Sequence, residues 1–199
     1  MDLVINNMRV VFLSILVLAC IGIKAQISDS NKHFKNAPVI NKVQVNVLRG
    51  QPISFFLNHS GIDINSKKVY KGEKSIHEEN ILNGIMDSLI SCGVEVRPFY
   101  FFIFNQIVDL SNGDQEERVA RVCKEFIENY PCDLFYSFNQ PELNINVVKW
   151  TTYIGLTLRD RANYIVFKNN VDSKIKTNCA DIQDLLKSFM AEVRMCLLR

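Results

Sequence analysis

The chain has 199 residues, of which 48% are apolar and 22% are charged, and these are ordinary values for a globular protein. Its formal net charge of +2 argues against a nucleic-acid binder, because such proteins normally carry a strongly basic surface. A chain of this length fits one domain that buries roughly 70% of its unfolded surface, so it has no need of disulfides to fold.

The amino-terminal end carries a short apolar segment. Residues 10–23 are 14 positions without a charge, which suits the core of a signal peptide and falls short of the ~20 residues that a membrane span needs. We therefore expect a secretory signal peptide over residues 1–25 that is cleaved after Ala25. Cleavage removes two basic residues and one acidic residue, so the net charge falls from +2 to +1. The mature chain is then exported to the periplasm, the outer envelope or the medium, with no transmembrane span.

A second interpretation of the same segment places a lipid on Cys20. Val17, Leu18 and Ala19 precede this cysteine and loosely resemble a lipobox, with Ala19 correct and Leu18 poor at its position. Lipidation would associate the mature protein with a membrane. Residues 26–41 follow as a flexible leader, and residues 42–199 form a single domain containing both helices and strands.

Five cysteines remain in the mature chain, and an odd number leaves at least one thiol unpaired in an oxidising compartment. No Cys-x-x-Cys spacing occurs, so neither a zinc knuckle nor a thioredoxin-type site is indicated. The pairing of the cysteines stays open. Three of them fall on or beside apolar helix stripes, where a free cysteine acts as a small buried hydrophobe: Cys92, Cys123 and Cys196.

The first elements of the domain are predicted from alternation and caps. Residues 42–49 alternate between apolar and polar side chains, and residues 53–57 form a short apolar run, so both indicate strands. Residues 58–74 are polar and predict a long loop. Ser75 and Glu78 have capping-box spacing at the start of a predicted helix over 76–92, and Gly93 ends it.

The middle of the chain combines a long apolar run with a second helix. Residues 94–104 predict a central strand covered on both faces, because 99–104 contain no polar group except a tyrosine hydroxyl. Asp114 and Glu117 repeat the cap spacing after a turn at 109–113, and an apolar stripe from Val119 to Tyr130 predicts a helix that Pro131 ends. Residues 132–138 predict a short strand.

The last third shows the clearest alternation of the chain. Residues 147–158 place Trp150, Ile154 and Leu156 on one face and predict a long strand, which a tight connection at 159–162 joins to a strand over 163–168. A helix over 180–198, capped by Asn178, follows. The predicted order is β-β-α-β-α-β-β-β-α, an α+β (α/β-like) fold in which a single mixed sheet of about six strands packs with three helices.

The search for chemistry in the sequence yields no catalytic, cofactor-binding or metal-binding residue. His59 and Ser60 lie side by side in the predicted loop without a nucleophile elbow around the serine. His77 and Glu78 begin like a zinc motif, but Ile81 stands where the second histidine belongs. The oxygen-bearing residues at 109–117 do not match the calcium-binding loop of an EF-hand, because Asp114 stands at the position where that loop has a glycine. Four lysines make the loop locally positive: Lys67, Lys68, Lys71 and Lys74.

The predicted order of elements over residues 42–198 resembles the TolB N-terminal domain and CsgG-like envelope lipoproteins. The matching features are a helix running through Ile90 and Cys92 into Gly93 and a strand, a helix ending before Pro131 and Leu134, and the hairpin over 152–168 with its closing helix. The resemblance implies an exported protein that binds other envelope proteins without catalysis. It carries over no individual functional residue, and the loop over 58–74 is longer than that pattern requires.

The first functional hypothesis is accordingly an exported, non-catalytic binding or assembly module whose partners are envelope proteins. It needs no cofactor and involves no nucleic acid. A hydrolase that uses His59 or Ser60 in the loop over 58–74 is an alternative hypothesis. Another alternative is a protein that binds a small ligand or a glycan in a concave patch lined by aromatic side chains.

Overall fold

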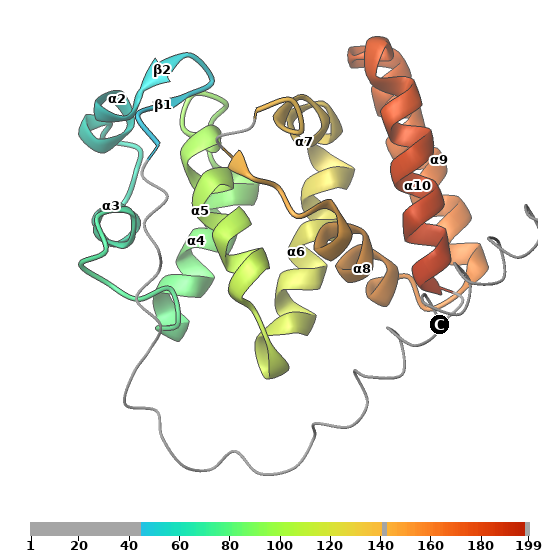
Figure 1. The fold of residues 1–199 in the computed structure, drawn as a ribbon, viewed down its shortest axis with the longest axis horizontal. Helices are drawn as coiled ribbons and strands as arrows, with labels where there is room; N and C mark the ends of the chain where they lie inside the picture. The colour runs from blue at the N-terminus through green and yellow to red at the C-terminus, as the bar shows by residue number, and fades with distance from the viewer. Residues whose placement is uncertain (1–44, 141–142, 198–199) are drawn as a thin grey trace, which may run out of the picture. The chain divides into compact units, whose positions relative to one another are not determined.

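A computed structural model of the chain describes residues 45–140 and 143–197 (Figure 1). All of them belong to one compact unit, Lys42–Arg199. The predicted signal peptide, its cleavage site after Ala25, the lipidation site at Cys20 and the leader lie outside the described residues.

Helices make up most of the described part of the chain. A small antiparallel hairpin joins β1 (Val47–Leu48) to β2 (Gln51–Pro52), with Val47 paired to Pro52. Two 3-10 turns, η2 (Gly113–Gln115) and η4 (Ala180–Ile182), precede α6 and α10. The α-helices in this part are α2 (Ile53–Asn58), α3 (Ile64–Tyr70), α4 (Glu79–Ser91), α5 (Arg97–Leu110), α6 (Glu116–Asn129), α7 (Pro131–Ser137), α8 (Val147–Thr157), α9 (Arg161–Asn178) and α10 (Gln183–Leu197).

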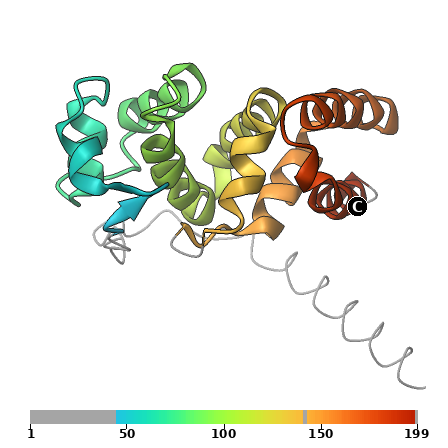
Figure 2. The same ribbon diagram turned by 90° about the horizontal axis from the view of Figure 1, so that it is seen from above.

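The longer helices of this unit stand in two layers. Figure 2 shows α4, α6 and α9 in one layer and α5, α8 and α10 in the other. Across the layers α4 packs on α5, α6 on α8, and α9 on α10. The short helix α7 packs against α6 and α9, and it lies close to the η4 turn.

The predicted α+β fold with a six-stranded mixed sheet is wrong, because the described residues contain only the two-stranded hairpin. Of the predicted strand at 42–49, only Val47–Leu48 is a strand among the described positions. The other predicted strands lie in helices: 53–57 in α2, 94–104 largely in α5, 132–138 largely in α7, 147–158 in α8 and 163–168 in α9. The three predicted helices are confirmed as α4, α6 and α10, but their predicted caps are wrong: α4 and α6 have no side-chain cap, and Asn178 is the last residue of α9.

The apolar run over 99–104 forms a helix because α5 is covered on nearly all sides. Every residue from Phe99 to Asn105 is buried, so the segment has no polar face to reveal a helical repeat. A short apolar run alone cannot distinguish a buried strand from a buried helix. Pro98 in the first turn of α5 favours a helix start, because its missing N–H is not needed there.

The alternation over 147–158 has a helical explanation. Trp150, Ile154 and Leu158 are buried at 0%, 0% and 1% exposure, whereas Val148 and Leu156 are 74% and 63% exposed. The side chains that looked like one strand face therefore form two sets with a step of four residues: Trp150, Ile154 and Leu158 are buried, and Val148, Thr152 and Leu156 lie on the outer face. Such a step places side chains on one face of a helix.

Aromatic side chains from α5, α6 and α8 meet in the middle of the two layers. The Trp150 ring lies 5.8 Å from Phe101, 5.8 Å from Phe104 and 6.0 Å from Phe126 between ring centroids. Its Nε1 donates a hydrogen bond of 3.1 Å to Oδ1 of buried Asn105. We call these five residues the aromatic centre. Its polar atoms are paired, so burying them carries little penalty.

Candidate functional site

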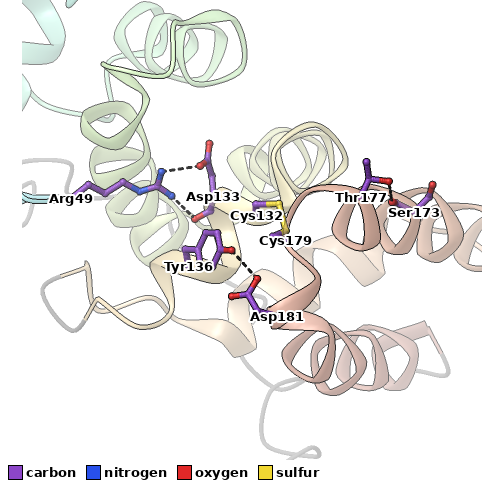
Figure 3. The surroundings of a disulfide bond; sticks show 8 residues. All are labelled: Arg49, Cys132, Asp133, Tyr136, Ser173, Thr177, Cys179 and Asp181. Carbon is purple, nitrogen blue, oxygen red and sulfur yellow. Dashed lines mark hydrogen bonds and ion pairs between the residues drawn. A yellow bond between two sulfur atoms is a disulfide. The ribbon is translucent and has the colours of Figure 1, made fainter.

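The short helix α7 carries polar side chains that bond to several distant parts of the described chain. It begins at Pro131, whose fixed φ suits the first turn of a helix. Three of its residues reach different neighbours: Cys132, Asp133 and Tyr136 (Figure 3). We call the resulting assembly the α7 joint, which consists of Arg49, Arg97, Cys132, Asp133, Tyr136, Cys179 and Asp181.

Asp133 pairs with two arginines from distant parts of the chain. Arg49, in the hairpin turn, donates from Nη1 to Asp133 Oδ1 at 2.8 Å and from Nη2 to its carbonyl oxygen at 3.0 Å. Arg97, at the start of α5, donates to Oδ2 at 2.9 Å. Both carboxylate oxygens are thus engaged, and the three side chains are only 12–28% exposed. The hairpin, α5 and α7 are held together by charge-assisted hydrogen bonds.

Arg97 extends the joint to the end of α4. Its Nη2 donates to the carbonyl oxygen of Cys92 at 3.1 Å, and its guanidinium lies 3.6 Å from the ring centroid of Tyr130. The Tyr130 hydroxyl in turn donates to the carbonyl oxygen of Ile90 at 2.6 Å. These bonds satisfy carbonyl groups that the last turn of α4 leaves free, and the aromatic face adds a cation–π contact.

The opposite side of α7 is joined to the carboxy-terminal helices. A disulfide links Cys132 to Cys179, which are 47 residues apart in sequence and 6.0 Å apart between Cα atoms. Figure 3 shows Tyr136 and Asp181 beside this bond, where the Tyr136 hydroxyl donates to Asp181 Oδ1 at 2.9 Å. This hydrogen bond raises the pKa of Tyr136 above its usual value. One covalent bond and one hydrogen bond therefore fasten α7 to the α9–η4 connection.

A small pocket opens between the hairpin, α5, α6 and α7. Its volume is about 10 Å³, which is room for roughly one water molecule. Binding sites for small organic ligands are larger by more than an order of magnitude. The pocket is lined by Leu48, Arg49, Arg97, Pro98, Phe101, Phe126, Asp133, Ser137, Gln140 and Leu143.

Within the described residues, the three cysteines outside the joint are free, which confirms the prediction of at least one unpaired thiol. Cys123 is fully buried in α6, and burial raises the pKa of its thiol well above the usual value. Burial also raises the pKa of Cys92, although neighbouring Arg97 opposes the shift. Cys196 is half-buried in α10. The raised pKa values make Cys92 and Cys123 poor nucleophiles at neutral pH.

The predicted loop over 58–74 contains α3 and does not assemble a hydrolytic site. His59 Nδ1 accepts the backbone N–H of Gly61 at 3.0 Å, and no hydrogen bond joins His59 to the Ser60 hydroxyl. The nearby carboxylate, Asp63, caps α3 by accepting from the backbone of Asn65 and Ser66 at 2.9 Å each. Burial raises the pKa of Asp63, but its hydrogen bonds outweigh that effect and hold the pKa below the usual value.

The acidic segment over 109–117 leads through η2 into α6, and its side-chain oxygens do not converge on one site. Ser111 shares a hydrogen bond of 2.8 Å with the Tyr153 hydroxyl, and Glu117 pairs with Arg121 on its own helix. Among the described residues, no group of three or more histidine, cysteine, aspartate or glutamate side chains is placed to hold a metal ion.

Comparisons with protein-family models, curated proteins and solved structures found no match for this chain. The segments that carried the resemblance to the TolB and CsgG-like domains as strands, 94–104, 132–138 and 152–168, are largely helical. The functional argument therefore rests on the residues described above. Within the two described ranges, no helix has the length and apolar character that crossing a membrane requires.

Proposed function

We propose that the mature chain is an exported, non-catalytic cell-envelope protein that serves as a binding or assembly module for other envelope components. The observation that carries this proposal is the disulfide between Cys132 and Cys179. Structural disulfides form and persist in oxidising compartments and are rare in the cytosol. The disulfide thus agrees with the export signal expected over residues 1–25.

The outer face of α8 supports binding to another protein. Val148 and Leu156 are 74% and 63% exposed, and half-buried Thr152 lies between them at the same helical step. An uncharged stripe of this kind provides exposed apolar surface for a partner. A small-ligand function has less support, because the pocket at the α7 joint has room for roughly one water molecule.

Photo-crosslinking in living cells tests the binding role. A photoreactive amino acid replaces Val148 or Leu156 on the stripe, and exposed Glu73 serves as the control position. We expect the two α8 positions, but not position 73, to give the same covalent adducts with envelope proteins, identified by mass spectrometry. Equal yields at all three positions, or no adduct at 148 and 156, would contradict the proposal.

Peptide mapping of the exported protein tests the compartment and the processing separately. The Cys132–Cys179 peptide pair should be recovered oxidised, and the chain should begin at Gln26 after cleavage behind Ala25. A diacylglyceryl group on Cys20 would instead show that the lipoprotein interpretation is right. Recovery of the protein in the cytosol with both Cys132 and Cys179 reduced would refute export.

A further inference from the structure

The helices α9 and α10 carry a stripe of basic residues each on their outer side. Figure 2 shows this pair at one end of the two layers, with no other described helix beyond it. Each stripe repeats at steps of three or four residues, which places its members on one face of the helix. We call the two stripes together the basic face. α9 contributes Arg161, Ile165, Lys168, Asp172 and Lys176, and α10 contributes Asp184, Lys187, Ala191 and Arg194.

Contacts between the two helices show that the stripes lie side by side. At the end of the pair near η4, Gln183 donates from Nε2 to Asp172 Oδ1 at 3.2 Å. At the other end, burial raises the pKa of Tyr164 at the start of α9, and the charge of Arg194 on α10 opposes the shift. Arg194 therefore lies close to the first turn of α9. The basic face is one continuous surface that spans both helices.

The basic face is strongly positive for a chain that is nearly neutral. It has five basic and two acidic side chains, so its formal net charge is +3, whereas the whole chain has +2. Both acidic side chains are already paired within the face, Asp172 with Lys176 at 2.7 Å and Asp184 with Lys187 at 2.8 Å. Among the described residues, three exposed basic side chains of the face form no ion pair: Arg161, Lys168 and Arg194.

We infer that the basic face binds the surface of a lipid bilayer that contains anionic phospholipids. Each Lys or Arg near such a surface strengthens binding roughly fivefold. Ile165 lies between Arg161 and Lys168 on the stripe and is 47% exposed, and the adjacent Val166 is 70% exposed. Exposed apolar side chains on a basic helix enter the boundary between headgroups and acyl chains, while the long basic side chains reach the phosphates.

The shape of the basic face favours a bilayer over a compact acidic ligand. The face follows α9, a helix of 18 residues that is about 27 Å long, so its charges are spread along a line. The stripe on α8 that serves the proposed protein partner contributes no residue to this face. The inference therefore goes beyond the proposed function and can fail independently of it.

Flotation of the mature, disulfide-bonded protein with lipid vesicles tests the inference. We expect binding to vesicles of phosphatidylglycerol mixed with phosphatidylcholine and no binding to vesicles of phosphatidylcholine alone. The double variant Lys168→Gln and Arg194→Gln removes two charges from the basic face and should weaken binding roughly 25-fold. Absence of binding to the anionic vesicles would overturn the inference, whatever crosslinking at α8 shows.

A matched double variant separates the basic face from the overall charge of the protein. Lys71→Gln with Arg121→Gln also removes one lysine and one arginine, from exposed positions after α3 and on α6. This control should bind the anionic vesicles nearly as well as the wild type. Both double variants should unfold at the wild-type urea concentration, because all four side chains are exposed. Equal weakening by the two double variants would overturn the inference.

Two further measurements distinguish a bilayer from a soluble acidic partner. Ile165→Gln keeps every charge and should still weaken binding to the anionic vesicles, because the apolar side chain no longer enters the bilayer. Unchanged binding of this variant would contradict the inference. Soluble polyglutamate should compete poorly with the vesicles. Strong competition would identify the basic face as a site for an acidic protein and would likewise exclude the bilayer.

Discussion

The aromatic centre and the α7 joint hold neighbouring helices by different forces. At the centre, Trp150 packs among phenylalanine rings and its one polar atom is bonded to Asn105. At the joint, Asp133 holds two arginines and Cys132 holds Cys179 covalently. Apolar packing does not depend on oxidants or on protonation, whereas ion pairs and disulfides do. The difference indicates that apolar packing at the aromatic centre forms the two layers. The stability that the α7 joint adds depends on the redox state and the pH of the compartment.

The largest effect should come from a charge placed beside the aromatic centre. Ile154→Asp buries an unpaired carboxylate at a position with 0% exposure, and its cost of several kcal/mol approaches the roughly 5–15 kcal/mol that stabilises a whole domain. We expect this variant to be unfolded by circular dichroism. Leu156→Asp, on the exposed face of the same helix, should cost about 1 kcal/mol or less. Equal stabilities would contradict the helical assignment of α8.

Removing the disulfide should have the next largest effect. The double variant Cys132→Ser and Cys179→Ser loses a crosslink between residues 47 apart, which should lower the free energy of unfolding by about 2–4 kcal/mol. Unfolding in urea should remain cooperative, because the aromatic centre is unchanged. Cys92→Ser removes a free thiol and serves as the control. If the double variant showed no cooperative unfolding transition, the disulfide of the α7 joint, and not the aromatic centre, would be what forms the fold.

The ion pairs of the joint should contribute less than the disulfide. Asp133→Asn weakens the bonds to Arg49 and Arg97, in which all three side chains are largely buried, and we expect a loss of about 1–3 kcal/mol in urea unfolding. Asp184→Asn breaks a pair with Lys187 in which both side chains are exposed. That control should change stability by less than about 1 kcal/mol. A larger loss for Asp184→Asn would reverse the ranking.

The smallest effect, with the opposite sign, should occur at Asp109. Burial raises the pKa of Asp109 against the lowering influence of Asn146 and Lys149, and its Oδ1 has no partner in the described residues. Its folded pKa therefore exceeds its unfolded pKa, so stability falls as pH rises through this window. Asp109→Asn should raise the urea midpoint at pH 7. The gain should shrink in acid, where the wild type is protonated, and a gain independent of pH would exclude this explanation.

The sequence predicts three amphipathic helices of this fold and misses α5 and α8, as well as α9, whose buried stripe of Tyr164, Phe167, Val171 and Ile175 is narrow. α4, α6 and α10 each have a polar face, so their apolar stripes repeat visibly. α5 is buried on nearly all sides, and α8 carries apolar residues on its exposed face as well as on its buried face, so neither helix has a polar face that distinguishes it from a strand. Helix starts were nevertheless marked in the sequence by N-cap residues that bond backbone N–H groups: Asp63, Asn146 and Asp160.

The α7 joint could not be predicted from local patterns. Asp133 lies 84 residues from Arg49 and 36 from Arg97, so nothing in the neighbouring sequence marks the three as partners. The odd cysteine count correctly predicted a free thiol, but irregular spacing left the pairing of Cys132 with Cys179 open. Only the packing of α7 against α9 brings these two cysteines together.

The Cys132–Cys179 disulfide also determines how the protein transmits mechanical force. A pull applied to the two ends of the chain passes directly through the bond and bypasses the residues between the cysteines, which include all of α8 and α9. At the length of a fully extended chain, the bypassed segment amounts to about 160 Å. While the disulfide is intact, a molecule stretched between two surfaces therefore cannot extend by this length. Reduction of the disulfide allows the segment to extend.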